Sequence, residues 1–126
     1  MRVEHLGIYA NDSEGLSRWY REKLGFSVVR KLEKEGRPPI YFLEGEGGWQ
    51  IEILPSPSPP HKRELTDPGY SHVGLVVEDF DRTAGLLQSK GVSLHDVRDT
   101  SNGWKIGYFE DPEGNRLEIV YRPRGG

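Results

Sequence analysis

An internal repeat constrains the fold of this chain more than any other feature of its sequence. Two segments share the pattern hydrophobic-x-His-hydrophobic-Gly-hydrophobic, one around His5 and the other around His72. Two further segments place Glu52 and Glu118 in matching apolar surroundings, at almost the same spacing along the chain as the two histidines. Self-similarity at a nearly fixed spacing is the signature of a repeated structural unit. We therefore expect two copies of one supersecondary module.

Hydrophobic periodicity and turn residues predict the same order of elements in both halves, strand–helix–strand–strand–strand. The expected strands of the first half are 2–10, 26–32, 40–43 and 49–54, and those of the second half are 70–78, 92–97, 104–109 and 116–121. The first helix has cap candidates in Asn11, Asp12 and Ser13 and ends at Gly25, and the second has cap candidates in Asp79 and Asp81 and ends at Gly91.

The two halves are joined by a segment that cannot form a central strand or a helix interior. It begins with six residues, 55–60, of which four are proline, and its composition stays polar as far as residue 69. The sequence thus divides into a first module at 1–54, a linker at 55–69 and a second module at 70–122. A chain of 126 residues is short for two independent domains, so we expect the modules to share one core.

Composition excludes several classes of function. The formal net charge is −3, which gives no basic field for nucleic acid or for an anionic membrane. The chain has no cysteine, so disulfides, thiolate metal sites and cysteine nucleophiles are absent. The N-terminal residues enter a strand pattern directly, without the apolar core of a signal peptide. We expect a cytoplasmic protein that binds neither nucleic acid nor membrane.

Strand alternation places both histidines and both glutamates on the same kind of surface. Successive side chains of a strand point to opposite faces, so residues i and i+2 share a face. In the strands of His5, Glu52, His72 and Glu118, the neighbouring aliphatic residues fall on the face opposite to the His or Glu. The two amphipathic helices should cover the aliphatic faces. The four polar side chains are then expected together on the uncovered face.

A divalent metal ion would satisfy these four side chains. Two imidazoles and two carboxylates suit zinc, nickel, cobalt, manganese or iron, and carboxylates in a partly enclosed site are costly unless paired. Gly7 and Gly74, two residues after each His and on its face, would leave room for a ligand. A decayed repeat could also keep such residues around a metal-free cavity, and this alternative stays open.

Four motifs resemble those of the vicinal oxygen chelate superfamily, which includes glyoxalase I, bleomycin-resistance proteins and extradiol dioxygenases. They are His5-Leu-Gly, Trp-Tyr-Arg-Glu-Lys-Leu-Gly-Phe at 19–26, His72-Val-Gly and Phe-Glu-Asp-Pro-Glu-Gly-Asn-Arg-Leu-Glu at 109–118. The resemblance covers nearly the whole chain. It implies an α+β fold over 1–126 as a single domain: two tandem βαβββ modules forming a curled, barrel-like sheet, with helices on the outer face and a metal on the concave side.

Within that superfamily, the set His5, Glu52, His72 and Glu118 looks most like bacterial glyoxalase I. Iron dioxygenases and fosfomycin enzymes typically have a non-ligand in place of Glu52, and methylmalonyl-CoA epimerase has Gln. The resemblance implies one divalent metal ion and a metal-dependent isomerase or lyase. Glu118, rather than Glu52, is the favoured carboxylate for taking and returning the substrate proton.

The resemblance also bears on the substrate. Members that act on glutathione adducts usually carry Arg and Asn where this chain has Tyr9 and Ser56. The resemblance therefore leaves open whether glutathione is the co-substrate. Candidate pocket walls are Trp104 and a tyrosine pair, Tyr41 and Tyr108, whose spacing equals that of the two histidines.

Three other functions and one mode of assembly follow from the same resemblance. A metal-free protein of the bleomycin-resistance type would bind a small apolar or cationic molecule, and an Fe(II) extradiol dioxygenase would use His5, His72 and Glu118. An epimerase of the same superfamily is a further alternative. Superfamily members pair modules within one chain or across a swapped dimer, and we expect a homodimer.

Overall fold

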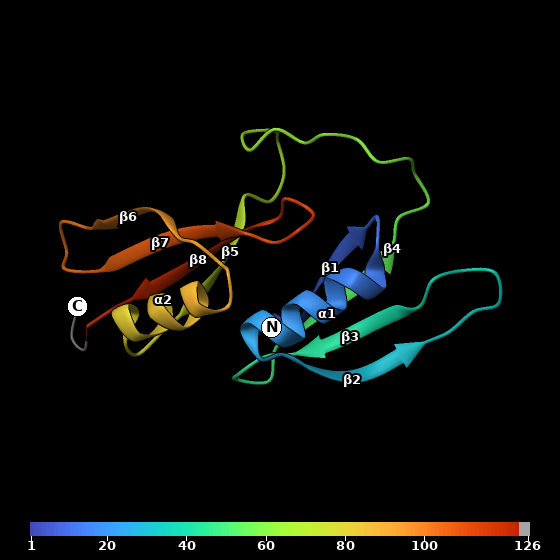
Figure 1. Ribbon diagram of the computed structural model, residues 1–126, viewed down its shortest axis with the longest axis horizontal. Coiled ribbons are helices and arrows are strands. Elements are labelled where there is room, and N and C mark those ends of the chain that lie inside the picture. The colour runs from blue at the N-terminus through green and yellow to red at the C-terminus, as the bar shows by residue number, and fades with distance from the viewer. Residues whose placement is uncertain (124–126) are drawn as a thin grey trace. The chain divides into compact units, whose positions relative to one another are not determined.

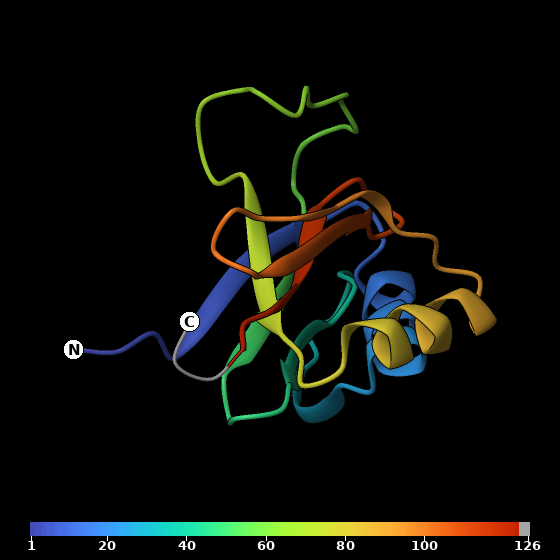
Figure 2. The same ribbon diagram turned by 90° about the vertical axis from the view of Figure 1, so that its left-hand side faces the viewer.

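The computed structural model describes residues 1–123, and the chain folds as two compact units. The first unit is Met1–Lys62 and the second begins at Arg63, so the boundary falls inside the predicted linker (Figure 1). Residues 56–71 contain no helix or strand and form the long loop at the top of Figure 2. In the part of the chain that the structure describes, no helix is long and apolar enough to cross a membrane.

The first unit is a βαβββ module. Its elements are β1 (His5–Ala10), α1 (Ser13–Leu24), β2 (Ser27–Leu32), β3 (Ile40–Glu44) and β4 (Gln50–Pro55). The strands form one sheet in the order β1-β4-β3-β2. β1 runs parallel to β4, whereas β3 is antiparallel to both β4 and β2. The chain returns from β1 to the sheet through α1, as a parallel neighbour requires.

The second unit repeats this topology. Its elements are β5 (His72–Val76), α2 (Phe80–Ser89), β6 (His95–Asp99), β7 (Lys105–Glu110) and β8 (Arg116–Tyr121). The sheet order is β5-β8-β7-β6, with β5 parallel to β8 and the other pairs antiparallel. Each sheet is curled and does not close on itself. The predicted α+β fold of two βαβββ modules is confirmed.

Both helices begin at an aspartate from the predicted cap candidates. The Asp12 carboxylate accepts a hydrogen bond of 2.9 Å from the backbone N–H of Gly15, and that of Asp79 accepts one of 3.1 Å from the N–H of Arg82. Each bond satisfies a donor that the first helical turn leaves free. α1 ends at Gly25, whose φ of 74° is the left-handed conformation that glycine adopts without strain.

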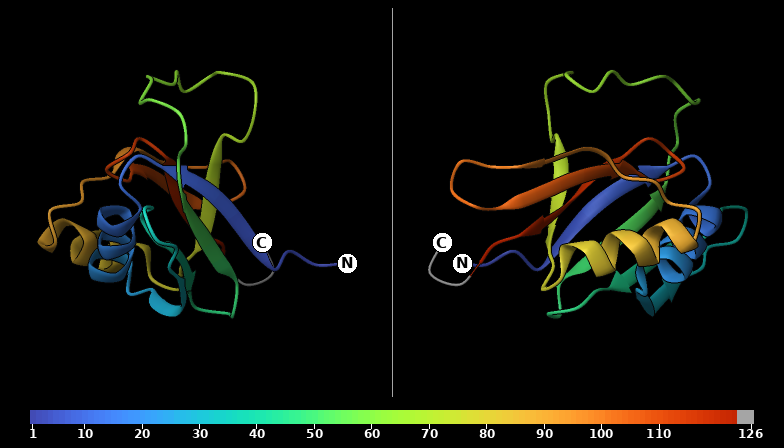
Figure 3. Two further views of the ribbon diagram at one scale, coloured as in Figure 1. Left: turned by 90° about the vertical axis from the view of Figure 1, so that its right-hand side faces the viewer. Right: turned by 60° about the vertical axis from the view of Figure 1, so that its left-hand side comes forward.

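The cores lie on the faces that alternation predicted. In the first unit, α1 packs across β1, β4 and β3, and Figure 3 shows this helix nearly end-on in its left panel. In the second unit, α2 packs against β8 and is seen side-on in the right panel. The buried side chains include Leu16, Tyr20, Leu43, Ile51 and Ile53 in the first unit, and Phe80, Leu87, Phe109, Leu117 and Ile119 in the second.

The structure corrects the predicted starts of several strands, by three residues for the strands predicted over 2–10 and 92–97. The sequence predicted a strand over 92–97, but β6 begins at His95. Val92 instead closes the end of α2, because its backbone N–H donates to the carbonyl of Leu87 at 2.9 Å. Its side chain is buried. The apolar character of Val92 therefore reflects packing below the helix end and not membership of the sheet.

The matching spacing of Tyr41 and Tyr108 does not reflect equivalent positions. Tyr108 pairs with Glu118 across β7 and β8, whereas the residue that pairs with Glu52 across β3 and β4 is Phe42. Phe42 and Tyr108 are therefore the equivalent residues, and their spacing is that of the two glutamates. Tyr41 pairs with Ile53, on the opposite face of the sheet.

Candidate metal centre

In the first unit, parallel pairing of β1 with β4 brings His5 and Glu52 onto one face of the sheet. Gly7 is the register partner of Glu52, so His5 lies two residues before that partner on the same face. The Nε2 atom of His5 is 3.7 Å from Oε1 of Glu52. We call this pair the first half-site.

In the second unit, β5 and β8 repeat the arrangement with the same register. Gly74 is the partner of Glu118, and Nε2 of His72 is 3.6 Å from Oε2 of Glu118. The side chain of His72 is 31% exposed and that of Glu118 is 15% exposed. This pair is the second half-site. Two units of different sequence thus hold a histidine and a glutamate in nearly the same geometry.

The side chain of the residue before each histidine lies within hydrogen-bonding distance of Nδ1 of the histidine ring. Nδ1 of His5 lies 2.7 Å from a carboxylate oxygen of Glu4, and Nδ1 of His72 lies 2.8 Å from the hydroxyl oxygen of Ser71. An ionised carboxylate only accepts hydrogen bonds, so Nδ1 of His5 carries the proton. In the neutral ring, Nε2 then presents its lone pair. Metal-binding histidines are commonly oriented by such a contact at the second ring nitrogen.

The distances within the half-sites fit donors that share one ion. A separation of 3.6–3.7 Å is longer than an ordinary hydrogen bond. Two donors each about 2.1 Å from one ion stand about 3.4 Å apart at a tetrahedral angle. In the neutral tautomer with the proton on Nδ1, the lone pair of Nε2 and the carboxylate oxygen are two acceptors facing each other, and a cation between them satisfies both. The donors of each half-site therefore suit a divalent metal ion.

The two glycines leave space beside the glutamates. A Cβ atom on Gly7 would stand 4.0 Å from Oε1 of Glu52 and 3.7 Å from Cδ1 of Leu54, and one on Gly74 would stand 3.5 Å from Oε1 of Glu118. These are ordinary contact distances, and neither glycine has a positive φ. A side chain is therefore possible at both positions, and it would fill the space next to the carboxylate.

An aromatic ring lies edge-on to each histidine. Phe42 is 6.3 Å from the ring of His5, and Tyr108 is 5.5 Å from the ring of His72. The Tyr108 side chain is also the register partner of Glu118 across β7 and β8. Interaction of its hydroxyl with the Glu118 carboxylate, followed by burial and the negative charge of Glu118, raises the pKa of Tyr108 above its ordinary value. The second half-site thus has a hydroxyl beside its carboxylate where the first has only a phenyl ring.

A charged network adjoins Tyr108 in the second unit. The ring of His95 stacks on that of Tyr108, and its nitrogens lie 2.6 Å from Glu110 Oε2 and 2.6 Å from Asp96 Oδ2. The hydrogen bond to Glu110, followed by that to Asp96, raises the pKa of His95. The guanidinium of Arg116 lies over the Tyr108 ring at 4.3 Å. The sequence did not predict this network, because the pairing of β6 with β7 and of β7 with β8 is what brings its residues together.

The predicted site residues separate into three groups. His5 lies beside Glu52 and His72 beside Glu118, and Tyr108 adjoins the second pair. Tyr41 does not line a half-site, because its side chain is 6% exposed on the opposite face of the sheet, among the core residues. Trp104 precedes β7, and its contacts are with the Thr100 turn and the guanidinium of Arg122, 4.2 Å from the ring.

Sequence reasoning missed Glu4, Ser71 and Phe42, which shape the half-sites. The signal for the first two was present in the repeat, since each stands directly before a repeated histidine. Phe42 could have been found by aligning the third strands on the glutamates instead of on the tyrosines.

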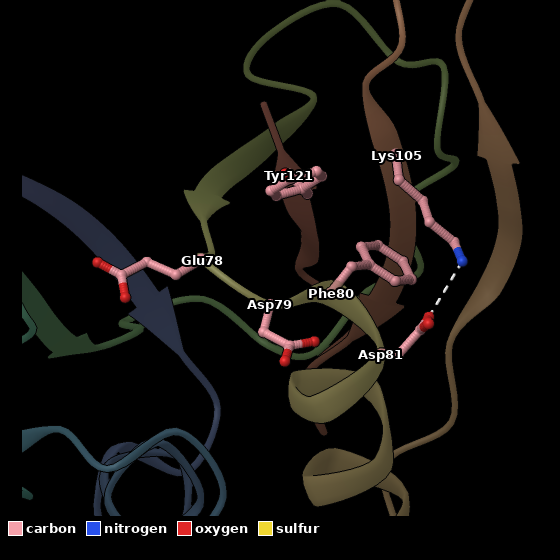
Figure 4. A pocket seen from close by; sticks show the side chains of 6 residues that line it. All are labelled: Glu78, Asp79, Phe80, Asp81, Lys105 and Tyr121. Carbon is pink, nitrogen blue, oxygen red and sulfur yellow. Dashed lines mark hydrogen bonds and ion pairs between the residues drawn. The ribbon is translucent and has the colours of Figure 1, made fainter. Parts of the chain in front are cut away.

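An open hollow at the start of α2 lies apart from these residues (Figure 4). It is lined by Glu78, Asp79, Phe80, Asp81, Lys105 and Tyr121. Asp79 caps the helix. Asp81 forms an ion pair with Lys105, whose Nζ lies 3.0 Å from Oδ1 of Asp81, and the dashed line in Figure 4 marks it. Asp79 and Asp81 therefore have structural roles.

Each half-site by itself is an incomplete metal site. Among residues 1–123, no group of three or more histidine, aspartate or glutamate side chains is arranged to hold a metal ion. Catalytic zinc sites use three protein ligands and structural sites use four, whereas a half-site offers two.

Comparison with known proteins identifies the family. Residues 2–119 match the model of the Glyoxalase/Bleomycin resistance protein/Dioxygenase superfamily. The chain is 28% identical to the uncharacterized protein YwkD of Bacillus subtilis, over 93% of this chain and 94% of that protein. It is 24% identical to a probable chloroplastic lactoylglutathione lyase of Arabidopsis thaliana, over 96% of this chain but only 36% of that protein.

A solved structure of similar fold comes from Enterococcus faecalis and is described as a glyoxalase family protein. Its TM-score is 0.82 at 27% identity, with 94% of this chain and 96% of that chain covered. The family match spans both units and all four residues of the half-sites. The chain belongs to the Glyoxalase/Bleomycin resistance protein/Dioxygenase superfamily.

Proposed function

We propose that this protein is a metal-dependent isomerase or lyase of the glyoxalase I type. It would move a proton next to a carbonyl and hydroxyl pair of a small substrate, with one zinc, nickel, cobalt, manganese or iron ion held by His5, Glu52, His72 and Glu118. The observation that carries the proposal is the repeated pair of Nε2 and carboxylate oxygen at 3.7 and 3.6 Å. The relationship to a probable lactoylglutathione lyase supports it.

The proposal requires the two half-sites to act together. Two donors do not hold a divalent ion tightly, so a four-ligand site needs one half-site of each kind. The two half-sites that share one ion would come from the same chain, acting as a single domain, or from two copies of the chain. We propose a homodimer, in keeping with the common dimers of this superfamily, and a cytoplasmic location.

The residues of the second half-site suggest how the proton moves. A bound metal ion would act as a Lewis acid on the two neighbouring oxygens of the substrate. Oε2 of Glu118 faces His72, whereas Oε1 faces the open space above Gly74. We assign Oε1 as the atom that takes the proton from the carbon beside the carbonyl and returns it to the neighbouring carbon. The Tyr108 hydroxyl would orient the carboxylate.

Glu52 remains the second candidate base. It occupies the equivalent position in the first unit, but its neighbour Phe42 has no hydroxyl to orient it. Glutathione is not part of the proposal, because Tyr9 and Ser56 stand where glutathione-dependent members carry Arg and Asn.

Metal titration tests the shared ion. Protein purified without an affinity tag should take up one equivalent of zinc or nickel per pair of half-sites, and His5→Gln and His72→Gln should each weaken binding severely. The double variant should bind little worse than either single variant, because all four ligands serve one ion. Binding of a second, independent equivalent, or additive losses, would contradict a shared site.

Proton exchange tests the assignment of Glu118. With hydroxyacetone in deuterated buffer, the metal-loaded protein should exchange the carbon-bound proton, and Glu118→Gln should lower the rate by a factor of about 100 or more. Glu52→Gln is the matched variant and should reduce exchange less at saturating metal. Equal exchange rates in wild type and Glu118→Gln would exclude Glu118 as the base.

A metal-free binding protein is the second candidate function. The aromatic rings of Phe42 and Tyr108 beside two carboxylates would suit a cationic ligand. Failure to take up any metal during titration would favour it. An Fe(II) dioxygenase or an epimerase would also use these positions, and oxygen uptake with catechols or inversion of a thioester substrate would identify them.

A further inference from the structure

We propose that Arg116, assisted by Arg98, binds an anionic group of the substrate, so that the physiological substrate is a carboxylate or phosphate that also carries two neighbouring oxygens. The inference deepens the proposed function and, for the two neighbouring oxygens, rests on it. The anion-binding role itself stands on the second unit alone.

Arg116 is fixed beside the second half-site by three contacts of the fold. It is the register partner of His72 across β5 and β8, and it lies two residues before Glu118 on the same strand face. Its guanidinium stacks on Tyr108 at 4.3 Å from the ring centroid. Stacking occupies the flat faces of a guanidinium and leaves its N–H groups, which lie in the plane, to bind a partner.

The N–H groups of Arg116 are poorly satisfied within the protein. The side chain is 22% exposed, and its Nε atom is buried without a hydrogen-bond partner. The nearest carboxylate, Asp96, is 3.8 Å from Nη2, beyond hydrogen-bonding distance. A buried donor without a partner is destabilising, and a carboxylate or phosphate that reached the guanidinium would supply the missing acceptor.

Arg98 adds a second positive charge to the same face. It is the register partner of Ile106 on β7, two residues from Tyr108, and its charge, like that of Arg116, acts on the Tyr108 hydroxyl. The acidic neighbours are already engaged, since Asp96 and Glu110 each lie 2.6 Å from His95. Asp96 also forms a long ion pair of 3.8 Å with Arg116, which leaves other N–H groups of the guanidinium to an anion from solution.

The first unit shows that these arginines are not required by the fold. At the equivalent register positions it has Gln50 in place of Arg116, Phe42 in place of Tyr108 and Leu32 in place of Arg98. The sheet tolerates neutral residues at all three positions. The first unit has a different arginine on this face, Arg30, which is the register partner of Phe42. A guanidinium stacked on the ring beside the histidine, with an unsatisfied Nε, is found in the second half-site, and we assign the anionic end of the substrate to it.

The test compares a neutral ligand with two anionic ligands, on protein variants that the repeat itself suggests. Dihydroxyacetone is the neutral probe, dihydroxyacetone phosphate adds a phosphate, and malate supplies carboxylates beside a hydroxyl. Arg116→Gln copies Gln50 of the first unit, and Arg98→Leu copies Leu32. Arg82→Gln removes one exposed positive charge from α2 and is the control for net charge.

The charged probes should bind the metal-loaded protein at least about 10-fold more tightly than dihydroxyacetone. Arg116→Gln should weaken the preferred charged probe by about 10- to 100-fold, and should weaken dihydroxyacetone and the metal by a much smaller factor. Arg98→Leu should have a smaller effect, and Arg82→Gln none. Preference for the phosphate or for the carboxylate probe identifies the anionic group. Equal affinity for neutral and charged probes, or no loss in Arg116→Gln, would overturn the inference.

A second measurement separates this inference from the proposed function. In NMR spectra of the ¹⁵N-labelled metal-free protein, inorganic phosphate or succinate should shift the Nε–H signal of Arg116, and the control signal of Arg82 should stay. This shift in a protein that takes up no metal would support anion binding while the metalloenzyme proposal fails. No shift with any anion, in a protein that does bind metal, would refute anion binding alone. If Arg116→Gln does not fold, Arg116→Lys serves instead and should lose part of the affinity, because lysine cannot form the two-pronged contact.

Discussion

Substitution of Gly74 separates the stability of the fold from the function of the second half-site. A Cβ atom on Gly74 would lie 3.5 Å from Oε1 of Glu118, which is a normal contact, and the φ of Gly74 is not positive. Gly74→Ala should therefore be neutral or stabilising by about 0.4–1 kcal/mol, since alanine restricts the unfolded chain. Gly74→Val adds two methyl groups next to the carboxylate, and the Glu118 side chain must move to make room.

Metal binding provides the readout. An ion that binds only the folded state at 100 times its Kd stabilises by about 2.7 kcal/mol. With an unfolding entropy of about 2.1 cal/mol/K per residue, a chain of 126 residues gains roughly 4 °C per kcal/mol, or about 10 °C in all. Displacement of a ligand carboxylate should cost about 10- to 100-fold in affinity. The same metal concentration should then raise the melting temperature of Gly74→Val by only about 5 °C or less.

The assay is thermal unfolding of apo and metal-loaded protein, with titration calorimetry for the Kd. Gly85→Ala is the matched control, because Gly85 lies in α2 with nothing within 4 Å of its added Cβ. It should stabilise the helix by about 1 kcal/mol and leave the metal-induced shift unchanged. If Gly74→Val keeps the full shift, then Glu118 does not bind the metal or the space beside it has no role.

Three further predictions concern the second unit. The pKa of His95 is raised by Glu110 and Asp96, and the pKa of Asp96 is lowered, so this network stabilises the fold above about pH 4 and stops doing so as pH rises through the raised pKa of His95. Urea denaturation from pH 4 to 9 should show the difference in unfolding free energy between wild type and His95→Gln disappearing at high pH. A difference that stays constant with pH would contradict this. Gly107→Ala places a Cβ 3.1 Å from Phe80 and from Val97, and should destabilise by about 1–3 kcal/mol in urea titrations; unchanged stability would show that these neighbours yield. Asp79→Ala removes the cap of α2 and should cost about 1 kcal/mol in the same titrations, with circular dichroism showing whether the helix persists.

The sequence was sufficient for the topology because the repeat and the strand alternation are local patterns. The positions of His5 and Glu52 opposite their aliphatic neighbours follow from a period of two residues, and parallel pairing then brings them together. Register was not accessible in the same way. Tyr41 and Tyr108 seemed equivalent from their spacing, but the hydrogen-bonded pairs of each sheet make Phe42 the equivalent of Tyr108. The one-residue difference moves Tyr41 to the opposite face.

Long-range pairing also explains why the network around His95 was not predicted. Its partner Glu110 lies 15 residues away on β7, and β6 reaches it only after a register shift between His95 and Arg98. The shift accompanies a φ of 52° at Asp96, a conformation that aspartate tolerates better than most residues. Neither the irregularity nor the contact leaves a periodic trace in the sequence.

The contrast between the two half-sites is informative because the repeat supplies its own control. The histidine, the glutamate, the glycine that pairs with it and the polar residue before each histidine occur at equivalent positions in both units. The residues around them differ: Gln50, Phe42 and Leu32 in one unit, and Arg116, Tyr108 and Arg98 in the other. A purely structural role for the histidine, the glutamate and the glycine would not explain why these residues are the same in both units while the residues around them differ. A shared metal ion and a substrate with one charged end account for both observations, since the ion needs like donors from each unit and an asymmetric substrate needs unlike surfaces.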